Sequence, residues 1–318
     1  MFAYVHDWDP IIFDIWRGIK LRWYGLSYLM AFVAAYYLLT YLSRKNLWVI
    51  AEKQIGDFIA LLAMLGVFVG GRLGYVLFYM LPSEGIALLR EDPLSVIRVW
   101  DGGMASHGGF LGVAIFTYFY ARKHRISWTG IGDGICLVAP VGLFLGRMAN
   151  FINGELYGRV APDLPWGVKF PQALASESYS TQESIVTACA DRAPEFADMA
   201  MTPHGLSEAV RKSSEVRAIA EQYLTARHPS QLYEGLLEGL LIFAIMWFLR
   251  FRFPRARNGW LCGIFFILYG GFRILAEQFR EPDSAMIGVF TKGQFYSLFM
   301  VLAGVAFLVT MPRAKLHD

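Results

Sequence analysis

Long apolar stretches separated by short polar segments dominate the chain. Seven of these stretches reach or approach the roughly 20 residues that cross a bilayer as a helix. Because a spanning helix satisfies its own backbone hydrogen bonds, the pattern predicts an all-α polytopic membrane protein with about seven transmembrane helices. The predicted spans are 24–42, 57–81, 106–121, 131–152, 232–249, 260–279 and 286–310.

Composition supports the membrane assignment. Hydrophobic residues make up 56% of the chain and charged residues only 17%, whereas soluble proteins have about 25% charged residues. The net charge of +3 is small, and no nucleic-acid partner is expected. The three cysteines have no spacing typical of a metal site or a disulfide framework, so we expect no metal or cofactor. The first 20 residues lack the basic and apolar regions of a cleavable signal peptide.

The loops differ in charge on the two sides of the predicted membrane. Basic segments follow spans one, three, five and seven, and cytoplasmic loops carry an excess of Lys and Arg. This predicts an N-terminus outside and a C-terminus in the cytoplasm. One long loop, 159–227, then forms a small extracytoplasmic head within a single domain, 1–318, and "WGVKF" (166–170) is a candidate strand in this head. The basic segments are 43–47, 121–125, 250–258 and the tail 312–315.

Polar residues within or beside the spans gather at one depth. Six spans place such residues toward the predicted outer face, whereas Asp57 and Asp133 are the corresponding residues on the inner side. Ionisable residues cost about 2.5–3.5 kcal/mol each at mid-membrane, so they are usually functional or paired. The outer set is Tyr24, Arg72, His107, Arg147, Asn150, Glu155, His228, Glu234, Arg273 and Glu277.

Several of these residues also have a structural interpretation. Arg72 could extend to the lipid headgroups, and Arg273 and Glu277, at i and i+4, could be a buried ion pair. Tyr269 lies on the same helical face as that pair. The like charges of Glu234 and Glu238 predict that at least one is paired with an arginine or protonated. Two glycines of span five, Gly235 and Gly239, are predicted to serve helix packing.

The outer-side residues suit a lipid phosphate. Arginine offers a planar fork that matches phosphate, and His107 and Tyr24 are candidates for proton transfer. No serine elbow, catalytic triad or metal cluster provides a nucleophile, which argues against a phosphatase or protease. The residues thus predict transfer of part of an anionic phospholipid to an acceptor that brings its own nucleophile. A transporter or flippase for an anionic lipid and a lipid-binding scaffold are the alternatives, but a transporter predicts charges at several depths.

Five segments, in order, resemble the prolipoprotein diacylglyceryl transferase family. They are "RWYGL" (22–26), "GGMASHGG" (102–109), "GRMANFINGELYG" (146–158), "RHPSQLYE" (227–234) and "YGGFRILAEQFREPD" (269–283). The resemblance extends over nearly the whole chain outside the head. Ser106 precedes the histidine where an aromatic residue is more usual in the family, and the head is longer.

The resemblance implies an activity and a set of site residues. The family transfers diacylglycerol from phosphatidylglycerol to the lipobox cysteine of a prolipoprotein signal peptide, and releases glycerol-1-phosphate at the outer face of the bacterial inner membrane. Carried over to this chain, Arg147 and Arg273 hold the phosphate with Asn150. His107 is the first candidate for the base, with Tyr24 and Glu277 as alternatives. The remaining expected site residues are Glu155 and Glu277 to orient the arginines, Tyr269 to line the groove, and Gly154 and Gly158 for close backbone approach. Arg72 is added as a substrate-binding residue because of its depth at the outer headgroups, and not because of the resemblance.

Overall fold

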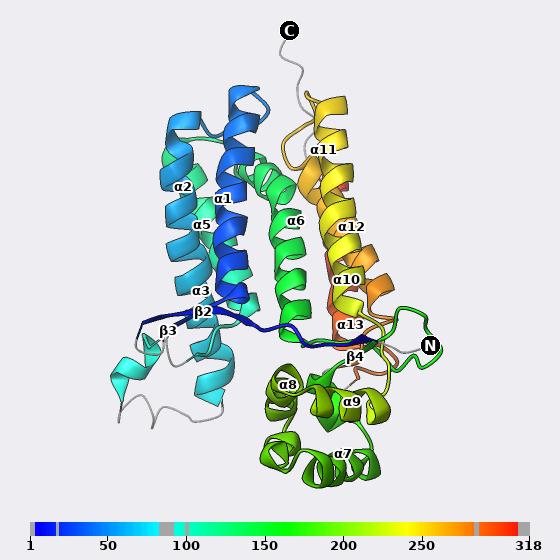
Figure 1. The fold of residues 1–318 in the computed structure, drawn as a ribbon. Helices are drawn as coiled ribbons and strands as arrows, with labels where there is room; N and C mark the ends of the chain where they lie inside the picture. The colour runs from blue at the N-terminus through cyan, green and yellow to red at the C-terminus, as the bar shows by residue number, and fades with distance from the viewer. Residues whose placement is uncertain (1–3, 17–18, 83–91, 99–101, 283–285, 311–318) are drawn as a thin grey trace. The chain divides into compact units, whose positions relative to one another are not determined.

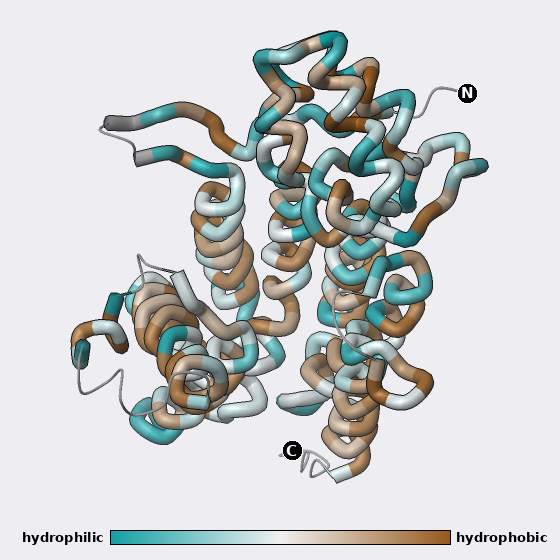
Figure 2. The backbone as a smooth tube through the Cα atoms, turned by 90° about the horizontal axis from the view of Figure 1, so that it is seen from below, coloured by the Kyte–Doolittle hydropathy of each residue, from teal (hydrophilic) through white to brown (hydrophobic). Residues whose placement is uncertain are grey.

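The computed structural model describes residues 4–16, 19–82, 92–98, 102–282 and 286–310, most of which are helical (Figure 1). The predicted basic tail 312–315 lies outside the described residues, and so does 83–91, between the second and third predicted spans. Helices occupy all seven predicted intervals, and five are long and apolar enough to cross a membrane. The chain is therefore a helical, multi-pass membrane protein. Figure 2 shows the long hydrophobic stretches along these helices.

The five long apolar helical segments include two with irregular interiors. In Glu52–Met80, π-helical turns flank α3, and in Ser230–Arg252 a π-helical segment, Gly235–Leu241, follows α10. Such turns are rare and are often found at functional sites. The segments are Trp23–Arg44 (α1), Glu52–Met80 (with α2, Ile55–Leu61, and α3, Gly70–Tyr75), Trp128–Asn153 (α6), Ser230–Arg252 (with α10, Ser230–Glu234, and α11, Ile242–Arg252) and Lys292–Thr310 (α13). The other two predicted spans correspond to Ser106–His124 (α5) and Trp260–Ala276 (α12).

The predicted start of the last helix at residue 286 is wrong. Gly288 has a φ of +59°, and Ile287 and Phe290 pair across a turn that helical geometry does not allow. The helix instead begins at Lys292, directly after Thr291. Thr291 and Gln294 exchange hydrogen bonds of 3.1 Å between each backbone N–H and the other side chain, which is a capping box.

The chain divides into two units, whose boundaries fall within α1, α6, α11 and α12. Among the described residues, the first unit contains those of 4–31, 139–248 and 263–310, and the second contains those of 32–138 and 249–262. In the second unit, α5 packs on α3 through glycines: a Cβ at Gly74 would lie 2.4 Å from the Cα of Gly108. In the first unit, a Cβ at Gly239 would lie 2.9 Å from the Cα of Phe144. The predicted packing role of Gly239 is thus confirmed.

The head is an ordered helical subdomain of the first unit. Its helices begin after the capping side chains of Ser178, Thr202 and Ser213, and the apolar sides of the helices form a core that includes Cys189 and Val5. The N-terminal strand β1 (Tyr4–Val5) pairs in parallel with β4 (Val168–Lys169), so the strand predicted in "WGVKF" is confirmed. The head helices are α7 (Tyr179–Arg192), α8 (Pro203–Lys212) and α9 (Ser214–Tyr223).

A second pair of strands precedes α1 and was not predicted. Strand β2 (Ile11–Trp16) pairs antiparallel with β3 (Ile19–Arg22). The two strands form a sheet of their own.

Candidate functional site

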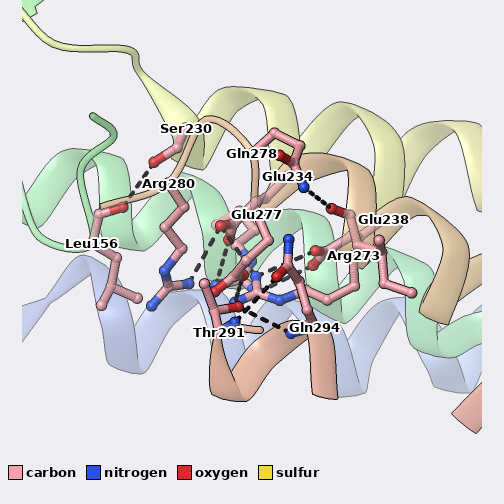
Figure 3. A network of polar contacts seen from close by, with 12 residues as sticks. Leu156, Ser230, Glu234, Glu238, Arg273, Glu277, Gln278, Arg280, Thr291 and Gln294 are labelled. Atoms are coloured by element: carbon pink, nitrogen blue, oxygen red, sulfur yellow. Dashed lines mark hydrogen bonds and ion pairs between the residues drawn. The ribbon is translucent and has the colours of Figure 1, made fainter. Parts of the chain in front are cut away.

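Buried arginine and glutamate side chains form one network of ion pairs in the first unit, part of which is shown in Figure 3. The chain brings them together from the end of α6, from α10 and the turn of helix after it, and from the end of α12 and the residues that follow. This network is called the ionic cluster below. Its members are Arg147, Arg273, Arg280, Glu234, Glu238 and Glu277.

Glu234 is the centre of the ionic cluster. Its Oε2 lies 2.8 Å from Nη1 of Arg147. Its Oε1 lies 3.1 Å from Nη1 of Arg273 and 3.3 Å from Nη1 of Arg280. One carboxylate therefore joins three arginines from three segments of the chain.

Glu238 lies one helical turn further along and joins two of the same arginines. Its Oε2 lies 3.1 Å from Nη2 of Arg147, and its Oε1 lies 3.4 Å from Nη1 of Arg273. The prediction that Glu234 or Glu238 pairs with an arginine is confirmed, and both do. The helical spacing of i and i+4 places the two carboxylates on one face, where they hold the two guanidinium groups side by side.

Glu277 completes the pairing of Arg273 and connects the cluster to α13. Its Oε2 lies 2.8 Å from Nη2 of Arg273, so the predicted i, i+4 ion pair is confirmed. A Cβ at Gly293 would lie 2.7 Å from the same oxygen, so a side chain at this position would displace the carboxylate. Gly293 is in the first turn of α13, where the helix dipole favours a negative charge.

Burial makes the members of the cluster depend on one another. The side chains of Glu234 and Glu238 are 1% and 0% exposed, whereas those of Arg147 and Arg273 are 16% and 12% exposed. The formal charges of the three arginines and three glutamates cancel, and each buried charge would be costly without its partners. Arg147 and Arg273 thus have more accessible side chains than the two glutamates. A guanidinium has five N–H donors, so these ion pairs do not use all the donors of either arginine.

The turn after α6 forms a second polar network. The helix ends at Asn153, and Gly154 and Leu156 have φ angles of +70° and +58°. Asn150 donates from Nδ2 to Oε1 of Glu155 at 2.7 Å and to the hydroxyl of Tyr24 at 3.4 Å. Three of the predicted site residues, Tyr24, Asn150 and Glu155, thus meet here.

Glu155 differs from its expected role. In the part of the chain that the structure describes, its carboxylate accepts hydrogen bonds from Asn150 and Asn153 instead of contacting an arginine. Gln231 Nε2 donates to the backbone carbonyl of Glu155 at 2.7 Å. Because Gln231 belongs to α10, this bond fixes the turn against the helix that carries Glu234.

Gly158 lies at a crossing of backbone segments. Its N–H donates to the carbonyl of His228 at 2.9 Å, and it forms an isolated β-bridge with Arg280. A Cβ at this position would lie 2.4 Å from the carbonyl oxygen of His228 and 2.5 Å from that of Phe279. The predicted close approach of backbone at Gly158 is confirmed, and it helps to hold Arg280 beside Glu234.

Aromatic residues surround His228 in the "RHPSQLYE" segment. Trp166 Nε1 donates to the Tyr233 hydroxyl at 2.7 Å, and this hydroxyl lies 3.3 Å from Nδ1 of His228. Because the indole N–H can only donate, the tyrosine hydroxyl is its acceptor and lies within hydrogen-bond distance of the imidazole as well. Burial lowers the pKa of His228, which agrees with a neutral ring. The ring also contacts Phe279 edge-on at 5.2 Å.

Tyr269, Arg72 and His107 occupy different places. Tyr269 lies one turn before Arg273 on α12 and stacks on Phe265, with ring centroids 5.9 Å apart. Arg72 and His107 belong to the second unit, and His107 is exposed at the start of α5.

Arg72 holds the segment that precedes His107. Its guanidinium donates to the backbone carbonyls of Val96 and Gly103 at 2.8 Å, and also to those of Ser95 and Gly102. The whole residue is only 8% exposed. Its donors are therefore used by the protein backbone, which favours a positioning role over the predicted contact with substrate.

Arg280 is the member of the cluster that sequence reasoning did not select. Glu234 and Glu238 were noted for their i, i+4 spacing but not counted among the site residues. That spacing, together with arginines at the same depth, could have indicated that Glu234 and Glu238 belong to the site. Among the described residues, no group of three or more His, Cys, Asp and Glu side chains is arranged to hold a metal ion.

Comparisons with known proteins show the family of the chain. The family model for prolipoprotein diacylglyceryl transferase matches residues 10–310. A phosphatidylglycerol–prolipoprotein diacylglyceryl transferase of Serratia proteamaculans is 40% identical over 313 residues, which cover 96% of this chain and 94% of the relative. Proteins of the same name from Bdellovibrio bacteriovorus and Rhodospirillum rubrum are 38% and 37% identical, over 98% and 96% of this chain and 94% and 93% of those proteins. The chain belongs to the prolipoprotein diacylglyceryl transferase family, as its motifs predicted.

Proposed function

We propose that this member of the family transfers the diacylglyceryl group of phosphatidylglycerol to the lipobox cysteine of a prolipoprotein signal peptide. The cysteine thiolate attacks the glycerol carbon that carries the phosphodiester oxygen. A carbon–sulfur bond forms, the carbon–oxygen bond breaks, and glycerol-1-phosphate leaves with the bonding electron pair. The thiol proton passes to a base. The reaction is the first step of lipoprotein maturation.

The ionic cluster carries this proposal. A phosphate leaving group gains negative charge as the carbon–oxygen bond breaks, and fixed donors at that position stabilise the transition state. Arg147 and Arg273 lie side by side on Glu234 and Glu238, with their planar forks already oriented. Preorganised arginines of this kind suit bidentate binding of phosphate.

The other site residues have supporting roles in this proposal. Glu277 orients Arg273, and Arg280 shares Glu234 with it. Asn150, whose amide donates to Glu155 and Tyr24, fixes the turn beside the cluster together with Glu155 and Gly158. The remaining roles are His107 as the first candidate for the base, Tyr24 as an alternative, Tyr269 in the substrate groove and Arg72 as the support of the segment before His107.

The proposed topology has seven spans, with α5 and α12 added to the five long apolar segments. The Lys and Arg distribution supports an N-terminus outside, a cytoplasmic C-terminus and a site toward the extracytoplasmic face of the inner membrane. We treat 1–318 as one transferase domain in which 159–227 is the head.

The proposal is tested with purified protein, phosphatidylglycerol and a synthetic lipobox peptide. We expect a diacylglyceryl mass increase on the peptide and release of one glycerol phosphate per modified peptide. A matched peptide with Ser in place of Cys controls for the thiol, and phosphatidylcholine controls for the lipid. Well-folded protein that modifies neither peptide, but moves labelled lipid between leaflets of a vesicle, would instead support the transporter alternative.

A further inference from the structure

The β2–β3 hairpin is a small sheet without a third strand. Its two strands pair with each other, in the part of the chain that the structure describes, and no other strand extends them. An isolated two-stranded hairpin is marginally stable in water unless one of its faces is covered. The hairpin therefore requires a stabilising contact beyond its own hydrogen bonds.

The central part of the hairpin has one apolar and one charged face. Phe13 pairs with Leu21, and the next pair along is Asp14 with Lys20. Because neighbouring residues of a strand point to opposite faces, the first pair forms an apolar patch and the second a charged one. Phe13 is 54% exposed, so the apolar patch is not buried by the protein.

The base of the hairpin is fixed to the end of a membrane-crossing helix. The backbone N–H of Trp23, the first residue of α1, donates to the carbonyl of Pro10 at 3.2 Å. Both ends of the hairpin thus meet where α1 begins. Figures 1 and 2 show the strands running crosswise to the first turns of α1. A segment crosswise to a spanning helix at its end runs along the membrane surface.

The charges of the hairpin suit an anionic surface. Lys20 and Arg22 are exposed and basic, Arg17 adds a third basic residue in the sequence, and Asp14 is the single acid of the 11–22 segment. Basic residues near an anionic bilayer are attracted to its negatively charged surface. Long basic side chains also reach phosphates while their stems cover apolar surface.

We propose that the hairpin Ile11–Arg22 is an in-plane membrane anchor at the bilayer surface where α1 begins. The Phe13 and Leu21 face enters the boundary between headgroups and acyl chains, and the basic residues contact the phosphates of anionic phospholipids. The anchor stabilises the hairpin and concentrates anionic lipid beside the membrane segment that carries Tyr24. This inference does not depend on the transfer reaction.

A single fluorescent label on either face tests the proposal. The native cysteines Cys136, Cys189 and Cys262 are buried, so Phe13→Cys and Asp14→Cys each provide one accessible thiol in the full-length protein. Each labelled protein is placed in nanodiscs of phosphatidylglycerol and phosphatidylcholine. We expect nitroxide-labelled lipid to quench the label at position 13 at least threefold more than the label at position 14, and aqueous iodide to do the reverse. Equal iodide access at both positions overturns the anchor.

Charge reversal tests the lipid preference. In the Phe13→Cys background, Lys20→Glu with Arg22→Glu should lower lipid quenching at least twofold in nanodiscs that contain phosphatidylglycerol. The same change should have little effect in pure phosphatidylcholine. An equal effect in both nanodiscs, or no effect in either, overturns the proposed contact with anionic lipid. An unchanged melting temperature of the variant shows that the fold is retained.

Discussion

At the scale of single residues, the ionic cluster combines charges that are individually costly. Buried ion pairs contribute little net stability compared with apolar groups, yet removal of one partner is expensive because the other charge stays buried. Glu234 and Glu238 are almost completely inaccessible and hold arginines from other segments. We therefore interpret the cluster as a device that fixes the positions of the guanidinium groups.

Glu238→Gln tests this dependence. The substitution keeps the shape of the side chain but removes one negative charge, which should cost on the order of 3 kcal/mol and lower the melting temperature by several degrees. Glu215→Gln, at an exposed ion pair with Arg192, is the matched control and should change little. Equal effects of the two substitutions in a thermal unfolding assay would show that the cluster is not energetically special.

Arg147→Lys tests the geometry of the guanidinium. Two different nitrogens of Arg147 contact Glu234 and Glu238, and the compact ammonium of lysine cannot reproduce this fork. We expect Arg147→Lys to recover only a small part of the transfer activity lost in Arg147→Ala. The activity of Arg147→Lys should stay at least tenfold below that of the wild type. Full activity with lysine, measured as kcat/KM for the peptide, would argue against a bidentate contact.

The sequence predicted part of this site, for a clear physical reason. Arg273 and Glu277 share a helical face, and their pairing follows from their spacing alone. Arg280 was missed because it lies after the helix, in a β-bridge with Gly158 that no periodic pattern encodes. The partner of Glu155 was also not predictable, because the turn after α6 depends on positive φ angles at Gly154 and Leu156.

At the scale of elements, glycines allow the cluster to form. Gly239 follows Glu238 and faces Phe144 of α6, one turn before Arg147. A Cβ at Gly239 would lie 2.6 Å from the Cβ of Phe144, a distance that forces the two helices apart. The close approach of α6 to the carboxylates of Glu234 and Glu238 thus depends on the absence of a Cβ at Gly239.

Gly239→Ala should therefore destabilise the protein and weaken the ion pairs of Arg147. Overpacking of this kind costs roughly 1–3 kcal/mol. Gly271→Ala on α12 is the control, because a Cβ there meets nothing within 4 Å. Thermal unfolding and transfer activity are measured together. A Gly239→Ala protein as stable and active as the control variant would contradict the packing argument.

His6 makes the N-terminal strand sensitive to pH. Its ring contacts Phe151 and Phe170 at centroid distances of 5.3 and 5.5 Å, and a Cβ at Gly154 would lie 3.2 Å from Nδ1 of His6. Burial lowers the pKa of His6 to about 4. A hydrogen bond with the backbone of Phe151 and the charge of Asp7 raise this pKa, and Arg211 lowers it further. The buried imidazole is thus neutral, and it packs on the turn that carries Glu155.

Stability should fall as the pH drops from 6.5 toward 4. In that window the unfolded chain binds a proton at His6 that the folded chain does not bind. The contribution of the neutral His6 to the free energy of unfolding is therefore present above pH 6.5 and is lost as the pH falls toward 4. The full loss of stability is on the order of 3 kcal/mol. Melting temperatures between pH 4 and 7 should show a smaller slope for His6→Phe, and an unchanged slope for a substitution of the exposed His204 by Gln. The same slope in wild type and His6→Phe would remove His6 as the cause.

Helices were predictable at this scale and the hairpin was not. Each of the seven predicted spans presents a long apolar run, and a run of that length has few structures available in a bilayer. In β2 the apolar residues Ile11, Ile12 and Phe13 are consecutive, and the pairing is irregular between Ile11 and Phe13. The alternation of apolar and polar residues that predicts a strand is therefore absent from β2.

At the scale of the whole molecule, the ten selected outer-side residues are divided between two units. Arg147, Arg273 and Glu277 belong to the first, whereas Arg72 and His107 belong to the second. Sequence analysis predicted a common depth from topology, but a depth does not specify which residues touch. The ionic cluster shows which residues the arginines contact. Our central claim is that these arginines bind the phosphate of the lipid.

Transfer by an Arg273→Gln protein tests that claim most directly. The measurement is the intact mass of a lipobox peptide after incubation with phosphatidylglycerol, and Arg192→Gln in the head is the matched control. We expect the diacylglyceryl mass increase with wild type and the control at similar rates, and a rate at least a hundredfold lower with Arg273→Gln in protein that remains folded. A folded Arg273→Gln protein that modifies the peptide at the wild-type rate would contradict a phosphate site at the ionic cluster.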